Sequence, residues 1–230
     1  MTNPYSKVFD DAATPYLDLL RGKTVTILGG DDEIDWARAE SSDVVVRING
    51  HWRRQEGRID ALWWSCASDL HGLGDWGEFA ACASGCRFVW LNKTHDLFGA
   101  NGGTFADDSA TLLELKIPFA EYWHAPAPAF DVFAVLRENV PADYWAKELA
   151  ERFGFYPLTG VLAAAYTIER TEASNIYLDG FSFYQGASGA LPAKAGKHAV
   201  APNVECFRTL VLENRERVEL SEKLRKILFP

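Results

Sequence analysis

The chain of 230 residues carries a formal net charge of −9, with 48% hydrophobic and 24% charged residues. This composition is typical of a globular protein, and the length is compatible with a single domain over residues 1–230. The acidic balance argues against nucleic acid or an anionic membrane as a partner, while a local pocket for one nucleotide stays compatible with it. No Cys-x-x-Cys pair is present, which argues against a zinc knuckle.

The N-terminal segment has no apolar run of the kind that a signal peptide needs, and no run in the chain is long enough to span a bilayer. We therefore expect a cytoplasmic protein with reduced thiols and no integral membrane segment. Residues 1–21 are predicted to form an N-terminal extension on the outside of the domain. A short helix is expected there over Thr14–Leu20, with Pro15 in its first turn.

Apolar runs separated by helical segments predict buried strands. They are expected at Thr24–Leu28, Asp43–Ile48, Ile59–Ser65, Arg87–Leu91 and Ile176–Leu178. Asp31–Glu33 are predicted to lie in the first turn of a short helix ending near Glu40, with their acidic side chains facing water. The alternation predicts an α/β fold with a single doubly wound, mostly parallel sheet flanked by helices.

Two loops in the first half contain candidate ligand residues. The loop Asn49–Gly57 and its flank hold three arginines, which fit either a solvated turn or part of an anionic site. The long loop Asn92–Asp107 begins just beyond the fourth predicted strand and contains His95. Because ligands bind at the carboxyl ends of strands in open α/β sheets, His95 is a candidate site residue, with a plain surface histidine as the alternative.

An apolar helix is predicted over Val161–Ile168, with Thr159 as its cap and Gly160 leaving the first turn without a side chain. Such a helix start can hold a phosphate on backbone N–H groups, but an ordinary buried αβ unit accounts for the same pattern. Residues 185–204 have no periodicity and are predicted to form a mobile lid. Glu205–Phe229 is predicted to be one long amphipathic helix.

Several common site signatures are absent from the sequence. The first predicted strand is followed by Gly29-Gly30-Asp31-Asp32 and not by Gly-x-Gly-x-x-Gly, which argues against NAD binding. The chain also lacks a P-loop, a Gly-x-Ser-x-Gly elbow and an Asp-x-Asp pair. No acidic, histidine or cysteine cluster has the spacing of metal ligands, so no metal site is expected.

A set of short motifs runs from Lys23 to Glu205. They are, in order, Gly29-Gly30, Arg47-Ile48-Asn49, Pro157-Leu158-Thr159-Gly160, Gly180-Phe181, His198 and Glu205. This order resembles the animal-type sialyltransferases of glycosyltransferase family 29, here in the form of a soluble bacterial or viral relative. The chain departs from the family at Gly30, where Asn is usual, and at Leu158, where Ser is usual. The family's disulfide has no cysteine at either end here, and its histidine-aromatic motif is not visible.

The resemblance implies a Rossmann-like fold, a variant of the GT-A glycosyltransferase fold. It implies a metal-independent, inverting glycosyltransferase with no cofactor, whose partners are a CMP-activated acidic sugar donor, sialic acid or Kdo, and a glycan or glycolipid acceptor. The implied nucleotide-binding residues are Gly29, Gly30, Asn49, Thr159 and Gly160. His198 would be the catalytic base or a phosphate ligand. Further candidates are Arg47, which would tie its strand to a neighbouring loop, His95, Gly180, and Glu205, which would cap the long helix or orient the lid.

Two other functions are compatible with the same residues. The first is a catalytically inactive nucleotide-binding or scaffolding protein on the same fold, which the change at Gly30 and the missing histidine-aromatic motif favour. The second is a transferase or hydrolase that uses another nucleotide. Donor hydrolysis and stabilisation by ligand distinguish these alternatives.

Overall fold

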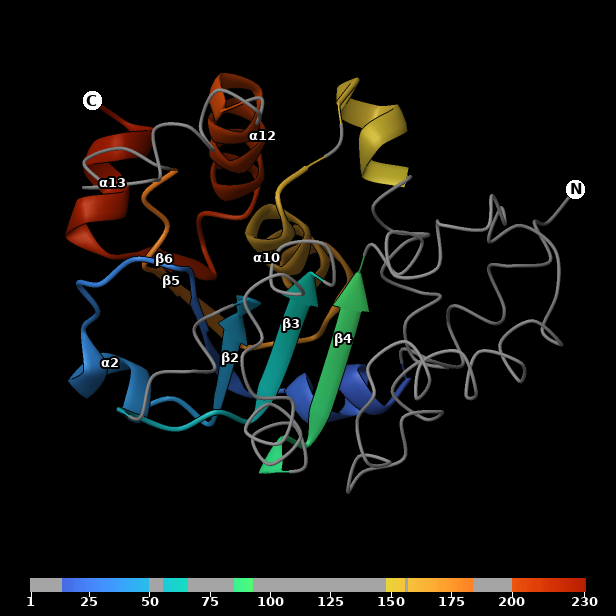
Figure 1. Cartoon of the computed structure of the whole chain (residues 1–230), viewed down its shortest axis with the longest axis vertical. Helices are drawn as coiled ribbons and strands as arrows, with labels where there is room; N and C mark the ends of the chain where they lie inside the picture. The colour runs from blue at the N-terminus through green and yellow to red at the C-terminus, as the bar shows by residue number, and fades with distance from the viewer. Residues whose placement is uncertain (1–13, 50–55, 66–84, 93–147, 156, 184–199) are drawn as a thin grey trace, which may run out of the picture.

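The structure is a computed structural model that describes residues 14–49, 56–65, 85–92, 148–155, 157–183 and 200–230 (Figure 1). Residues 93–107 of the predicted loop Asn92–Asp107 and residues 185–199 of the predicted lid lie outside the described residues. Residues 148–153 are helical.

The described strands form one six-stranded sheet in the order β4-β3-β2-β1-β5-β6, and every neighbouring pair is parallel. The strands are β1 (Thr24–Leu28), β2 (Val44–Ile48), β3 (Ala61–Ser65), β4 (Phe88–Asn92), β5 (Asn175–Asp179) and β6 (Val218–Leu220). The predicted Rossmann-like, doubly wound α/β fold is confirmed. Five of the strands were predicted to within two residues, and β6 was missed.

The main core lies between the sheet and the helices α10 (Thr159–Arg170) and α12 (Val200–Glu213). Every residue of α10 from Val161 to Ile168 is buried, as its apolar sequence predicts. Near β3 and β4 the core is aromatic: Trp63 and Trp90 stack with ring centroids 4.5 Å apart, and Tyr166 of α10 packs on both.

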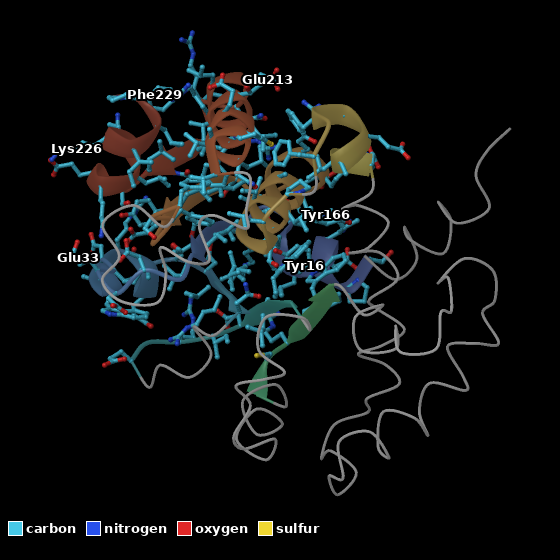
Figure 2. All side chains as sticks on the ribbon, turned by 45° about the horizontal axis from the view of Figure 1, so that its top comes forward. Tyr16, Glu33, Tyr166, Glu213, Lys226 and Phe229 are labelled. Atoms are coloured by element: carbon cyan, nitrogen blue, oxygen red, sulfur yellow. The ribbon has the colours of Figure 1, made fainter. Side chains whose placement is uncertain are left out.

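The helical residues 14–20 complete this aromatic core, which corrects their placement on the outside of the domain. Tyr16 is fully buried, and its hydroxyl group makes a 3.0 Å hydrogen bond with Thr167 of α10. The Tyr16 and Tyr166 ring centroids are 6.0 Å apart. Figure 2 labels both side chains, which lie close together. The segment belongs to the hydrophobic core, because the Tyr16 ring and Leu20 cover apolar surface that the strands and α10 leave open.

The opposite face of the sheet is covered by α2 (Trp36–Glu40), which packs on Leu28 and Val45. This helix begins later than expected, because Asp35 occupies its N-cap position and accepts a hydrogen bond from the Arg38 N–H. Asp31–Glu33 therefore lie in the preceding loop and not in the first turn. The Asp31 N–H is bonded to the Gly180 carbonyl, which holds this loop against the end of β5.

The prediction of one long C-terminal helix over Glu205–Phe229 is wrong. The chain forms α12, then β6, then α13 (Glu222–Leu228), and α13 lies beside α12 (Figure 1). The Asn214 side chain bonds the Leu210 carbonyl at the end of α12, β6 pairs with β5, and Ser221 caps α13. Because α12 starts at Val200, the last residues of the predicted lid 185–204 are its first helical turn.

Candidate functional site at the carboxyl ends of the strands

The site is built around the place where the chain reverses its direction of travel across the sheet. From β1 the chain continues to β2, β3 and β4 on one side, whereas β5 lies on the other side of β1 and leads to β6. The carboxyl ends of β1 and β5 therefore meet at a topological switch point, which is where open α/β sheets bind ligands. Gly29-Gly30 follows β1 and Gly180-Phe181 follows β5.

At the switch point two glycines cross at backbone contact distance. A Cβ atom on Gly29 would lie 2.3 Å from the Gly180 carbonyl oxygen, and Gly180 has a φ of +73°. The Gly29 N–H donates to the Asp179 carbonyl at 2.8 Å. Because the two backbones approach so closely, both positions require glycine. The neighbouring Gly30 is exposed, and a Cβ atom there would meet nothing within 4 Å, so a ligand can reach this residue.

The end of β2 adds a polar side chain to the same edge. Asn49 follows β2 directly, is half-buried and has a φ of +49°, a left-handed conformation that Asn adopts more readily than most residues. Its neighbour Ile48 lies against the first turn of α10, since a Cβ atom on Gly160 would be 3.5 Å from the Ile48 Cδ1 atom. Asn49 and the start of α10 are therefore close together.

The first turn of α10 carries Thr159 and Gly160. Thr159 is the first helical residue and is buried, so it is not the N-cap that the sequence predicts. Leu158 occupies that position in an extended conformation without a side-chain cap, because the buried Thr159 has already entered the helix. The N–H groups of a first helical turn have no intrahelical acceptor, and this end of the helix favours anions.

Apolar side chains fix the position of that turn. A Cβ atom on Gly160 would lie 2.9 Å from the Phe181 ring, and the Phe181 ring packs on Phe207 of α12 with centroids 5.0 Å apart. The side chain of Asn203 in α12 accepts a 2.8 Å hydrogen bond from the Leu158 N–H. Asn203 is buried and was not predicted as part of the site. The available signal was Pro202, a residue typical of a first helical turn.

The loop between β1 and α2 is acidic and is held by the C-terminal helix. Lys223 of α13 makes ion pairs with Asp31 at 2.7 Å and with Glu33 at 2.9 Å. The hydrogen bonds that Lys223 donates, first to Asp31 and second to Glu33, raise the pKa of Lys223. Glu33 projects at the surface near α2 (Figure 2). Since Asp31 faces Lys223 and is only partly accessible, the expectation that all three acids face water is wrong for this residue.

Together, the ends of β1, β2 and β5 and the start of α10 bring the five predicted nucleotide-binding residues to one edge of the sheet. Gly30 is exposed, and Asn49 and Gly160 are half-buried, whereas Gly29 and Thr159 are buried. The acidic β1–α2 loop disfavours phosphate on its own side. The chemistry of this edge therefore suits an anion placed at the first turn of α10.

The remaining predicted residues differ in their positions and contacts. Arg47 is buried and donates to the carbonyl groups of Glu56 and Arg58, which confirms that it ties β2 to the following loop. Glu205 is exposed within α12 and pairs with Arg208, so it does not cap the helix. His95 and His198 lie outside the described residues.

Among the described residues, no group of three or more His, Cys, Asp and Glu side chains could hold a metal ion. No helix among them is both long enough and apolar enough to cross a membrane.

Comparisons with known proteins gave one distant likeness. No protein-family model matches the chain, and no curated protein matches it. A similar solved structure is the apo form of an alpha-2,3-sialyltransferase from Campylobacter jejuni, with 14% sequence identity and a TM-score of 0.44. The alignment covers 87% of this chain and 80% of that one.

Proposed function

We propose that the chain is a glycosyltransferase that binds a nucleotide-activated sugar at the carboxyl edge of β1, β2 and β5. The observation that carries this proposal is the convergence of Gly30, Asn49 and the first turn of α10 at the topological switch point. The proposed donor is a CMP-activated acidic sugar, sialic acid or Kdo. The cytidine assignment comes from the order of the sequence motifs and not from the geometry.

The proposed mechanism needs few protein groups. When the bond between the sugar and the nucleotide phosphate breaks, negative charge develops on the leaving phosphate. The N-terminal turn of α10 would stabilise that charge through its backbone dipoles, with the Phe181 ring excluding water from the other side of Gly160. Asn49 would hydrogen-bond the nucleotide across from α10. This arrangement supplies charge stabilisation without a metal ion, and attack from the opposite face of the sugar would invert its anomeric centre.

The acceptor hydroxyl needs a base, and His198 is the proposed one. Histidine titrates near neutral pH and can accept a proton from a hydroxyl group that attacks the sugar. His198 precedes Val200, the first residue of α12, by two positions in the sequence. The first turn of α12 is tied to the start of α10 through Asn203 and Leu158. The acceptor is proposed to be a glycan or a glycolipid.

A nucleotide-binding or scaffolding protein without turnover is the second candidate. Gly30 favours it, because this position presents no side chain to a ligand where the resembled family usually has Asn. Such a protein would be stabilised by CMP but would neither transfer nor hydrolyse a donor sugar.

The test combines nucleotide binding with turnover. CMP and CDP should raise the melting temperature more than UMP, GMP or AMP, because a ligand that binds only the folded state stabilises it by mass action. CMP-sialic acid or CMP-Kdo should then be consumed with release of CMP. Binding without consumption favours the scaffolding protein, and equal stabilisation by all bases contradicts the cytidine assignment.

A pair of asparagine variants localises the binding. Asn49→Gly removes the amide at the carboxyl end of β2 and suits the positive φ, so it should weaken CMP binding without straining the backbone. Asn175→Ala removes an amide at the amino end of β5, where it bonds Glu219, and should leave CMP affinity unchanged. Loss of affinity in Asn175→Ala alone would place the nucleotide at the other end of the sheet.

A further inference from the structure

The buried carboxylate of Asp179 is not used by the proposed mechanism, although it lies at the switch point. Asp179 is the last residue of β5 and is 3% exposed. Ile176 and Leu178 face the main core, so Tyr177 and Asp179 face the α2 side of the sheet. Arg38 of α2 lies over the Tyr177 ring, which agrees with this orientation.

Both oxygens of this carboxylate bind backbone N–H groups. Oδ2 accepts from the Asp35 N–H at 2.9 Å, and Oδ1 accepts from the Gly180 N–H at 2.7 Å. Neither described partner is a cation. A buried charge without a cation is costly, so its hydrogen bonds must offset the loss of water. A carboxylate is the only short side chain that offers two acceptor atoms, whereas an Asn at this position offers one.

These bonds belong to a larger set that fixes the loop between β1 and α2. The Gly29 N–H donates to the Asp179 carbonyl, and the Asp31 N–H donates to the Gly180 carbonyl at 2.9 Å. The Asp35 N–H, bound by the carboxylate, is the third attachment point along this loop. The loop is thus held at its beginning, its middle and its end by Asp179, the last residue of β5, and by Gly180, which follows it. Gly30 lies between the first two attachment points and remains exposed.

We propose that Asp179 is a positioning residue of the nucleotide site. Its carboxylate holds the Asp35 end of the loop and the Gly180 N–H, while the main-chain carbonyls of Asp179 and Gly180 hold Gly29 and Asp31, so that Gly30 faces the ligand beside α10. This inference rests on the proposed function, because Gly30 matters only if a nucleotide binds there. Asp179 touches no reacting atom. It acts through the loop, and the side chain is aspartate because two N–H donors must be bound at once.

The test compares Asp179→Asn with Thr26→Val. Thr26 of β1 lies in the same buried layer, and its hydroxyl bonds the Ser42 hydroxyl at 2.6 Å, so Thr26→Val also loses a buried polar contact but does not touch the loop. Both variants should be destabilised, as shown by lower urea midpoints. Only Asp179→Asn should accelerate amide hydrogen exchange at Asp35 and Gly180. It should also weaken CMP binding by about tenfold, because a loop released at Asp35 presents Gly30 to the ligand in only a fraction of the molecules.

The possible outcomes test the proposed function and the positioning role of Asp179 separately. No CMP binding by the unchanged protein contradicts the proposed function, and with it this inference. CMP binding that is equal in the unchanged protein and in Asp179→Asn overturns the positioning role alone. An equal loss of affinity in Thr26→Val assigns the effect to general destabilisation and also overturns it. If Asp179→Asn does not fold, Asp179→Ser keeps one acceptor atom and serves for the same comparison.

Discussion

The crossing of Gly29 and Gly180 predicts that adjacent glycines respond very differently to the same substitution. In Gly29→Ala the new Cβ atom would be 2.3 Å from the Gly180 oxygen and 2.6 Å from its carbonyl carbon. Both neighbours are backbone atoms, so the ends of β1 and β5 must move apart. That movement strains the hydrogen bonds from Gly29 to Asp179 and from Asp31 to Gly180. In Gly30→Ala the Cβ atom meets nothing within 4 Å.

The expected magnitudes follow from these contacts. Overpacking and the weakening of two backbone hydrogen bonds should lower the free energy of unfolding of Gly29→Ala by about 3–5 kcal/mol. For a domain of this size, that corresponds to a fall in Tm of roughly 10 °C. Gly30→Ala should leave stability unchanged or raise it by up to about 1 kcal/mol, because alanine restricts the unfolded chain. Gly160→Ala should lie between them, since its Cβ atom meets the edge of the Phe181 ring at 2.9 Å.

The assay is urea unfolding and thermal melting of the three variants, combined with titration of CMP. Gly30→Ala serves as the control for stability and as the probe for the ligand: it should melt like the unchanged protein but bind CMP more weakly. A Gly29→Ala variant with an unchanged Tm would refute the close backbone crossing. A Gly30→Ala variant as unstable as Gly29→Ala would refute the assignment of Gly30 to open space.

Three further predictions concern chemistry and pH. If His198 is the base, His198→Ala should lower the transfer rate by a factor of about 10²–10⁴ and keep CMP affinity within a few-fold. Unchanged turnover would contradict this role. A loss of CMP affinity alongside the loss of turnover would make His198 a phosphate ligand. Turnover should survive EDTA, and a complete loss restored by magnesium or manganese would assign the enzyme to a metal-dependent class. Burial raises the pKa of Tyr16 from 10.0 to about 12. The unfolded chain therefore releases this proton at lower pH, and the free energy of unfolding should fall by about 2–3 kcal/mol between pH 10 and 12. Tyr16→Phe should show a smaller fall over that range in urea titrations, and an identical fall would contradict the burial of the hydroxyl group.

The sequence predicted those strands and helices that one continuous run of residues specifies. β1 was predicted with its observed bounds, because Thr24–Leu28 is an apolar run flanked by a lysine and a glycine pair. The buried face of α10 was predicted in the same way from its Ala-rich run. The C-terminal helix was wrong because Val218, Leu224 and Leu228 fall on a helical repeat although two separate elements bury them. A strand as short as Val218–Leu220 offers too few residues for alternation to be recognised.

The sequence did not predict how the candidate residues differ in their packing. Gly29 and Gly30 are equivalent in sequence, and only the distant pairing of β1 with β5 makes one a packing glycine and the other an exposed one. Asp179 ends a predicted strand and reads as a turn residue, because its partner Asp35 is far away in the chain. Asn203 was assigned to a lid for the same reason, since its contact with Leu158 joins two distant segments.

A crystal structure with bound CMP tests the central claim most directly. The account predicts the phosphate at the first turn of α10, beside Gly160, with the nucleoside between Gly30 and Asn49 at the carboxyl ends of β1 and β2. The β1–α2 loop should keep its bonds from Asp31 and Asp35 to the end of β5. CMP bound on the α2 face or at the amino ends of the strands would contradict the assignment of this edge as the nucleotide site.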